Sequence, residues 1–430
     1  MLFGIKKIAS QNSLQLFLFS FLLISGFSIQ ACPIYLSSQV LANANAYSSK
    51  NLFLMFINKE GQWEKANLQI DPMDEDGILT FNDTDANQNL SGYNRLVFYK
   101  KSFGSRFSYS QQLPMCQNRQ ALELQKNGKY AYLIACSNNL LHPRIDSEQP
   151  QSSVLYNMLL PSLQSELYTY KFNPDNHMLF KSIDFSQKRK IQRIADNSNL
   201  LIFSDLKNFF SLSFEDDIQS QLNSHRIGPL GVSANVNFFL EILFFKIKLS
   251  LMTDVNFFPD SAHIPMKVYT PYDTKKHLNT NSGILYSWLN SEDLELDSKS
   301  TILKFSEFMD INNREKKIKA LCPDRSECIF KLIYNSKSIG NNLVMEFHIS
   351  KELLTKNFYP VFIDDLSQLE KLSWPMKRLN RKIEEKQVGL FFAISALGQG
   401  ESAWDFWLRL GNNSQSTETC PDTLHAIRRL

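Results

Sequence analysis

Residues 67–100 read NLQIDPMDEDGILTFNDTDANQNLSGYNRLVFYK, and this stretch decides how the fold is interpreted. Its two ends, residues 67–70 and 95–99, have the composition of short β-strands, and the residues between them are rich in carboxylates and amides. Asp and Asn favour turns, whereas branched and aromatic side chains favour strands. The stretch therefore predicts a hairpin-like pair of strands around a polar loop.

The polar loop has oxygen-donor side chains at the spacing of a calcium site. They are Asp83, Asp85, Asn87, Asn89 and Asn94. Counted from Asp83, they occupy positions 1, 3, 5, 7 and 12 of an EF-hand-type loop, which places alternate oxygens around one hard cation. Gln88 stands where such loops have Gly, and the twelfth position is an amide instead of a carboxylate, so we expect weak affinity. The alternative is a solvated turn without a cation.

Residues 1–31 have the features of a secretion signal. Lys6 and Lys7 precede an apolar run over residues 16–29, which is too short to span a bilayer comfortably. We expect an exported protein of the periplasm or cell envelope. An uncleaved N-terminal anchor is the alternative. Residues 235–255 are the next most apolar stretch, and Glu241, Lys246 and Lys248 interrupt them in a strand-like pattern.

Six cysteines indicate disulfides, because thiols oxidise in an exported chain. Cys322 and Cys328 bracket a short polar turn, and Cys116 and Cys136 lie on neighbouring candidate strands. Each pair is expected to form a bridge. The cysteines and the seven scattered histidines lack the spacing of a zinc site.

Cys32 follows Ala31 in a context that resembles a bacterial lipobox, although Gln30 departs from the usual pattern. Two outcomes stay open. Either Cys32 is lipidated and Cys420 is left over, or the two cysteines pair and join the ends of the chain. Membrane attachment is expected only through this lipid or through an uncleaved signal.

Length and charge limit the classes of function. A chain of 430 residues, 43% of them hydrophobic, is long enough for two or three packed domains. Lys6 and Lys7 account for two of the 46 basic residues, so 44 basic residues face 43 acidic ones in the remainder. Such a balance gives no electrostatic footprint for nucleic acid.

Strand signals recur at short intervals with little helical periodicity, which predicts a mainly β protein of two or three β-sandwich-like domains. The amphipathic pattern of a helix is clearest at residues 365–372. The expected organisation follows composition and turn signals. It consists of a signal peptide at 1–31, a tether at 32–50, an N-terminal β domain at 51–152, a central β region at 153–270 and a C-terminal β-rich region at 271–430.

Several short motifs resemble those of a family of exported bacterial β-proteins for which no activity is established. They are LQID at 68–71 with Asp74 and Gly77, RLVF at 95–98, FEDDI at 214–218 and GPL at 228–230. The resemblance covers roughly residues 51–270, and it implies that the loop is a degenerate copy of a fuller calcium motif. The later region also resembles large sandwiches of the galactose-mutarotase type, an analogy of fold that carries no function.

Candidate catalytic groups are few. Glu215, Asp216 and Asp217 could supply an acid/base pair, but neighbouring residues on a strand point to opposite faces, and a cap or turn is the simpler interpretation. We expect His225 to lie at the surface beside Arg226, and His348 to be a solvent-facing or satisfied strand residue.

Residues 403–410, AWDFWLRL, form an aromatic strand. Alternation places Trp404 and Phe406 on one face and Trp407 on the other, where aromatic rings either pack in a core or stack on sugars. The sequence favours a non-enzymatic binding or structural module of the cell envelope, with its partner unknown. The alternative is a carbohydrate-active enzyme or sugar-binding protein, with Glu215, Asp216 or His225 in a cleft.

Overall fold

The computed structural model describes most of the chain from residue 32 to residue 430. The residues outside the description are 1–31, 76, 78, 81–89, 109–112, 115, 117–118, 138–153, 158–161, 175, 188–189, 206–210, 215–217, 243–244, 271–272, 279–281, 324–326, 339, 367–386, 413–418, 422–423 and 425. The expected signal peptide and most of the expected helix at 365–372 therefore lie outside the described residues. The chain is mainly β, as the strand pattern predicted. Among the described residues, no helix is long and apolar enough to cross a membrane.

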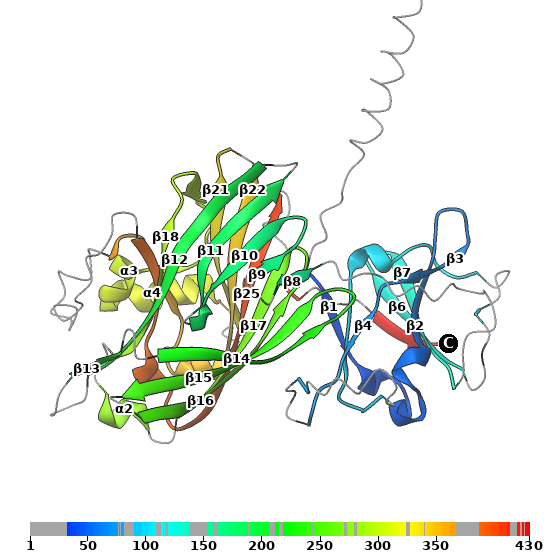
Figure 1. Cartoon of the computed structure of the whole chain (residues 1–430), viewed down its shortest axis with the longest axis horizontal. Helices are drawn as coiled ribbons and strands as arrows, with labels where there is room; N and C mark the ends of the chain where they lie inside the picture. The colour runs from blue at the N-terminus through cyan, green and yellow to red at the C-terminus, as the bar shows by residue number, and fades with distance from the viewer. Residues whose placement is uncertain are drawn as a thin grey trace, which may run out of the picture.

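The N-terminal domain contains a three-stranded and a five-stranded sheet (Figure 1). The first has the order β1 (Ile34–Ser37), β5 (Arg95–Phe98), β4 (Gln69–Asp71). The second has the order β26 (Ala426–Arg429), β6 (Gln120–Lys126), β7 (Lys129–Ala135), β2 (Leu52–Ile57), β3 (Trp63–Ala66). The pairing of β4 with β5 confirms the two strands that flank the acidic loop. Because β26 comes from the last residues, this domain is built from both ends of the chain.

The expected tether at 32–50 is wrong. β1 pairs with β5, and three short 3₁₀ turns follow it before β2 begins. Leu41 and Tyr47 are buried in the core of this domain together with Leu54 and Leu96. Small polar residues suggested a flexible linker, but single apolar side chains spaced along the turns are enough to anchor the segment.

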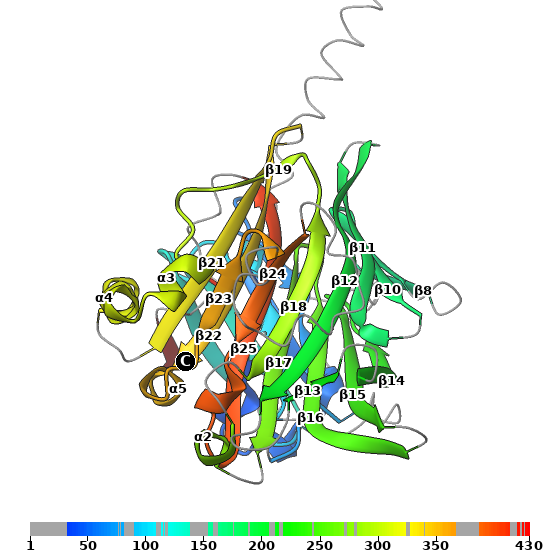
Figure 2. The ribbon, with the colours of Figure 1, turned by 90° about the vertical axis from the view of Figure 1, so that its left-hand side faces the viewer.

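The large domain is a sandwich of two extensive sheets (Figure 2). The ten-stranded sheet contains β20 (Leu303–Lys304), β23 (Pro360–Ile363), β24 (Gln387–Phe392), β18 (Gly283–Asn290), β12 (Lys190–Asp205), β11 (Asn176–Gln187), β10 (Tyr168–Asn173), β9 (Ser162–Gln164) and β8 (Leu155–Asn157) in that order, with β13 (Ser211–Phe214) also paired to β12. The eight-stranded sheet has the order β14 (Ile218–Ile227), β15 (Val232–Ile242), β16 (Phe245–Phe257), β17 (Ser261–Thr270), β25 (Gly400–Asn412), β22 (Asn341–Ser350), β21 (Glu327–Ser336), β19 (Leu294–Leu296).

The expected boundary between residues 270 and 271 is wrong, because each sheet takes strands from both sides of it. β17 pairs along its whole length with β25, and β12 pairs with β18. The regions predicted as 153–270 and 271–430 therefore form one sandwich. The short helices α3 (Phe305–Met309), α4 (Ile311–Leu321) and α5 (Lys351–Thr355) gather at one edge of it (Figure 2).

The eight-stranded sheet has two buried faces of opposite character. On the inner face, Met345, Phe347 and Leu408 belong to the apolar core shared with the ten-stranded sheet. On the outer face, which the N-terminal domain covers, the alternating positions are mainly polar. Period-two alternation assigns Trp404 and Phe406 to the inner face and Trp407 to the outer face, as the sequence predicted.

The structure contains three disulfides. Cys116–Cys136 and Cys322–Cys328 are the expected local pairs, and Cys32–Cys420 joins residues 388 positions apart. The sulfur of Cys32 cannot hold both this disulfide and a thioether-linked lipid. Of the two outcomes that the sequence left open, the structure has the disulfide, and the expectation of a lipid on Cys32 is incompatible with it.

Candidate functional site

A row of side chains crosses the outer face of the eight-stranded sheet from β21 to β14. We call it the polar row, and its members are Lys331, Glu346, Trp407, His263, Asn256, Ser233 and Arg226. Each is the direct cross-strand partner of the next, and directly paired residues project from the same face of a sheet. The register therefore gathers residues from seven strands into one line beneath the N-terminal domain.

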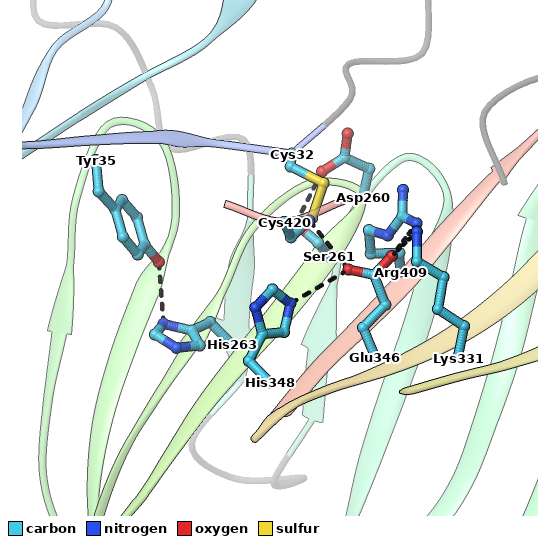
Figure 3. Close-up of a disulfide and its surroundings, with 10 residues drawn as sticks. All are labelled: Cys32, Tyr35, Asp260, Ser261, His263, Lys331, Glu346, His348, Arg409 and Cys420. Carbon is cyan, nitrogen blue, oxygen red and sulfur yellow. Dashed lines mark hydrogen bonds and ion pairs between the residues drawn. A yellow bond between two sulfur atoms is a disulfide. The ribbon is translucent and has the colours of Figure 1, made fainter. Parts of the chain in front are cut away.

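Glu346 is the ionic centre of this row (Figure 3). Its side chain is fully buried, forms ion pairs with Lys331 at 3.1 Å and with Arg409, and accepts the backbone N–H of Cys420 at 3.0 Å. The Nε2 atom of His348 lies 3.6 Å from Glu346 Oε2. Burial by itself would raise the pKa of Glu346, but His348 and the charges of Arg409 and Lys331 outweigh it and lower the pKa to about 2. The carboxylate is therefore charged and held on several sides.

His263 links the two domains through one ring nitrogen, Nδ1, and bonds within the eight-stranded sheet through the other, Nε2. Its Nε2 lies 2.8 Å from Asp405 Oδ1 on β25. Its Nδ1 lies 3.2 Å from the hydroxyl of Tyr35 on β1 (Figure 3). A carboxylate only accepts, so Nε2 donates to Asp405 and the neutral ring accepts from Tyr35 at Nδ1. The imidazole also stacks on Trp407, with ring centroids 4.1 Å apart. Burial lowers the pKa of His263, although Asp405 opposes the shift, so the neutral form is favoured.

Arg95, on β5 of the N-terminal domain, reaches across the interface to the outer face of the eight-stranded sheet. Its guanidinium pairs with buried Asp71 at 2.8 Å and donates to Asn256 Oδ1 at 2.8 Å. The same group lies 4.7 Å from the centre of the Tyr35 ring. One arginine therefore joins the acidic residue that ends β4 to the polar row of the large domain, with the directional bonds that a guanidinium provides.

The turn between β14 and β15 gives the domains a further contact. Gln69 Oε1 accepts the N–H of Leu230 at 3.1 Å. A Cβ atom on Gly228 would lie 2.4 Å from the same oxygen, so this turn approaches the N-terminal domain more closely than a residue with a side chain allows. The GPL motif at 228–230 is thus part of the domain interface.

The Cys32–Cys420 disulfide lies in the middle of the interface, beside Asp260 and Ser261 (Figure 3). Asp260 is buried, and one carboxylate oxygen accepts the Ser261 hydroxyl at 3.1 Å. Its other oxygen, Oδ2, has no hydrogen-bond partner within the described part of the chain. Burial raises the pKa of Asp260 to about 8, against the opposing effects of Ser261, Arg409 and Lys101. The carboxyl group is therefore largely protonated at neutral pH.

These contacts make the outer face a closed interface. Glu346, Trp407 and Cys420 are each fully buried, so these groups do not meet solvent. A charged pair taken out of water stabilises a structure only when its partners are held in place. The partners of Glu346 come from the eight-stranded sheet, and the bonds of Arg95 to Asn256 and of Tyr35 to His263 join the domains beside them.

The residues expected for the cation loop are mostly outside the described part of the chain. Asp83, Asp85, Asn87 and Asn89 fall there, so calcium stays a prediction. Asn94 is described, and its Oδ1 accepts the backbone N–H of Ser91 at 3.2 Å and the hydroxyl of the same residue. That oxygen serves a turn, and a calcium-ligand role for Asn94 stays a prediction. Among the described residues, no group of three or more His, Cys, Asp or Glu side chains is arranged to hold a metal ion.

The candidate catalytic residues are not brought together in the described structure. Glu215, Asp216 and Asp217 lie outside the described residues. His225, expected at the surface, packs against Tyr156 of β8 with ring centroids 5.0 Å apart, at the opening between the two sheets of the sandwich. His348 is a strand residue whose ring nitrogens lie 3.6 Å from Glu346 and 3.7 Å from Glu327. At these distances its buried Nε2 makes no hydrogen bond within the described residues, so the ring is not fully satisfied.

Two strands of the sequence contain a signal for the polar outer face. Glu346 and His348 alternate with apolar residues in one strand, and Asp405, Trp407 and Arg409 occupy alternate positions in another. Charged residues that share one face of each apolar strand predict a polar face of the sheet. Glu346 and Arg409 are 63 positions apart, however, so their contact depends on a pairing that local patterns do not reveal.

No protein-family model matches the chain, and no curated protein matches it by sequence. Two solved structures are similar in shape. An alpha-mannosidase from Enterococcus faecalis is 7% identical with a TM-score of 0.37, covering 92% of this chain and 43% of its own. A protein in the glycosyl hydrolase family 38 from the same organism is 8% identical with a TM-score of 0.38, covering 92% of this chain and 44% of its own. The chain spans less than half the length of either protein. At these scores the likeness carries no conclusion about activity.

Proposed function

We propose that the chain is an exported, non-enzymatic binding or structural module of the cell envelope that acts as one braced two-domain body. The observation that carries the proposal is the burial of Glu346 with Lys331 and Arg409 beneath the N-terminal domain. An acid/base catalyst must reach its substrate within hydrogen-bond distance. These side chains instead reach one another and the backbone of Cys420.

The disulfides support the proposal that the protein resides in an oxidising compartment outside the cytosol. Three bridges use the six cysteines, and one of them connects the beginning of the N-terminal domain to the C-terminal segment. Disulfides persist in oxidising compartments, where a protein that must hold its shape without cytosolic repair gains from them. A rigid body with both chain ends joined suits a module that presents a surface to a partner.

The competing function is that of a carbohydrate-active enzyme or a sugar-binding protein. It needs a carboxylate pair or exposed aromatic rings at an open cleft. Trp404 and Trp407 are both buried, one in the sandwich core and one at the domain interface, so neither offers a ring face to a sugar.

The test combines fractionation with an activity screen. The full chain, produced in the organism that encodes it, should be found in the periplasmic or envelope fraction. Its cysteines should react with an alkylating reagent only after reduction and denaturation. The purified chain should release no product from a panel of α- and β-linked aryl glycosides. Glycoside hydrolysis that disappears on substitution of a single carboxylate would overturn the proposal in favour of the enzyme.

A further inference from the structure

Two buried oxygen atoms of the domain interface make no hydrogen bond within the described residues. They are Asp260 Oδ2 and the hydroxyl of Tyr99. Asp260 is 4% exposed and Tyr99 is 1% exposed. Burial raises the pKa of Tyr99, and the nearby charge of Asp260 adds to that shift. A buried oxygen without a donor is costly. Two acceptors this close to each other would suit a single group that has several N–H donors.

Both oxygen atoms lie next to Cys32, just before β1 begins. Figure 3 shows the Asp260 carboxyl group beside the disulfide of Cys32. Ile34 of β1 is the partner of Phe98 of β5, so Tyr99 lies beside the residues that precede β1. Tyr99 and Cys32 also belong to one buried cluster. Only Cα and Cβ separate the backbone nitrogen of Cys32 from its sulfur, so this nitrogen lies in the same small region of the interface.

The sequence predicts that this nitrogen becomes the N-terminal amine of the exported chain. Residues 1–31 have the features of a secretion signal, and Ala31 is a small residue of the kind that precedes a cleavage site. Hydrolysis of the Ala31–Cys32 peptide bond gives the hydroxyl of water to the carbonyl carbon of Ala31 and a hydrogen to the nitrogen of Cys32. A leader is removed during export, before disulfides form in the oxidising compartment, so the burial of Cys32 in the folded chain does not prevent cleavage.

We propose that leader removal leaves the Cys32 amine as a buried ammonium group that pairs with the Asp260 carboxylate and donates to the Tyr99 hydroxyl. The charges balance without an outside proton, because the carboxyl group that burial keeps protonated passes its proton to the amine. An ammonium group has several donors and no acceptor, which suits two oxygen acceptors. A buried ion pair is favourable only when further hydrogen bonds support it, and Tyr99 supplies one.

The other cations near Asp260 are placed differently. The charges of Arg409 and Lys101 reach Asp260. Arg409 is held by Glu346, however, and Lys101 is a surface residue. The ammonium group would therefore be the cation in contact with Asp260. Because Cys32 precedes β1 and Asp260 lies between β16 and β17, the new ion pair joins the two domains. Export would in this way complete the interface. The pairing rests on the export that the proposed function includes, and it does not depend on what the module binds.

The rate at which an acylating reagent labels the N-terminus of the processed chain tests the pairing. The chain is produced in the organism that encodes it and purified with its disulfides intact, and mass spectrometry identifies its first residue. We expect that residue to be Cys32. Only the unprotonated amine reacts, and a neighbouring carboxylate keeps it protonated. At pH 7 the amine of the parent chain should therefore react at least about tenfold more slowly than that of Asp260→Asn, which corresponds to a pKa difference of about one unit.

Asp254→Asn is the matched control. Asp254 is another buried carboxyl group of the interface, and burial raises its pKa as well. Its oxygens accept the Asn235 amide at 2.7 Å and the N–H of Leu79 at 2.9 Å, so it has partners of its own. Its substitution should leave the labelling rate unchanged. Tyr99→Phe keeps the packing and should raise the rate by a smaller factor than Asp260→Asn. Thermal melting confirms that each variant is folded.

The effect of Asp260→Asn on stability at neutral pH should also change sign with processing. When Ala31→Leu blocks cleavage and residues 1–31 stay attached, Asp260→Asn should not lower the melting temperature, because it removes a carboxyl group that burial keeps protonated. In the processed chain the same substitution should lower it, because it leaves a buried ammonium without its counter-charge. Melting curves of the two forms in the same mild detergent measure this.

Three results would overturn the pairing. The first is an equal labelling rate in the processed parent and in Asp260→Asn, which would leave water as the partner of the two oxygens. The second is an exported chain that begins at a residue other than Cys32. In both cases export itself would stand. The third is a chain that keeps residues 1–31 and stays in the cytosol, which would contradict the proposed function as well, so the two failures are distinguishable.

Discussion

The two faces of the eight-stranded sheet are both buried along β22 and are chemically opposite. Along β22, Met345 and Phe347 point into the apolar sandwich core, while Glu346 and His348, between and after them, point toward the N-terminal domain. Burial of the inner face is favourable for each side chain separately, at roughly 25 cal/mol per Å² of apolar surface. Burial of the outer face is favourable only for the whole set, because a charge without its partners in a dry interface is costly. The inner face can therefore vary one residue at a time, and the outer face cannot.

The largest expected effect on stability comes from removing the charge of Glu346, at the centre of the outer face. Glu346→Gln leaves Lys331 and Arg409 buried without their counter-charge, and it should lower the free energy of unfolding by about 3–5 kcal/mol. Denaturant unfolding at pH 7 measures this. The folded-state pKa of Glu346 is about 2 and its ordinary value is 4.5, so the contribution is complete above pH 4.5 and is lost as the pH falls toward 2.

The inner face supplies the control for that prediction. Phe347→Ala should cost a similar amount, about 3–5 kcal/mol, because it removes apolar area and leaves a cavity. Its cost should not vary between pH 2 and pH 7, since no titratable group is removed. If both substitutions showed the same pH dependence, the contrast between the faces would be wrong.

The disulfide across the interface is expected to have the next largest effect. Replacing Cys32 and Cys420 together by Ser should lower stability by about 2–4 kcal/mol, because the bridge restricts the unfolded chain over a separation of 388 residues. Replacing Cys322 and Cys328, which are six residues apart, should cost less. Unfolding in the absence of reductant compares the two, and a larger loss from the shorter loop would contradict the prediction.

Asp260 is expected to give the opposite dependence on pH. Its pKa is raised from 3.8 to about 8, so its contribution to stability is complete below pH 3.8 and is lost as the pH rises through 8. Asp260→Asn cannot ionise, so in the chain that keeps residues 1–31 it should gain stability relative to the parent chain as the pH rises through that window. Melting temperatures at pH 4, 6 and 8 test this. A constant difference across the series would show that Asp260 is not kept protonated by burial.

The smallest effect is expected from loss of the neutral hydrogen bond between Tyr35 and His263, which joins the two domains. Tyr35→Phe removes the hydroxyl that donates to His263 Nδ1, and it should cost about 0.5–1.5 kcal/mol. Because that bond favours the neutral imidazole, its loss should also raise the pKa of His263 toward its ordinary value. Titration of the imidazole by NMR measures the shift, and Tyr93→Phe, at an exposed tyrosine of the same domain, is the control.

Local patterns predicted the strands well and the connections between them poorly. The strands at residues 95–99 and 403–410 and the division of Trp404 from Trp407 follow from alternation within one segment. The boundary expected at residue 270 failed because β17 pairs with β25, a partner far along the chain. The tether failed because β1 gains its stability from β5 and not from its own composition.

The interface escaped prediction for the same reason. Glu346, His263 and Arg95 come from three separate segments, and no local spacing in them indicates which residues of the other segments they contact. The acidic loop has the densest set of polar side chains in the sequence, but the residues that contribute to the domain interface lie at its two ends. There Asp71 and Arg95 form a buried ion pair that bonds the polar row.

The central claim is that the polar outer face braces the two domains into one cooperative unit. Differential scanning calorimetry of the oxidised chain tests it most directly. We expect a single transition whose calorimetric and van't Hoff enthalpies agree. We expect it to divide into two transitions when Glu346→Gln is combined with loss of the Cys32–Cys420 disulfide. Two separate transitions in the unmodified chain would contradict the account.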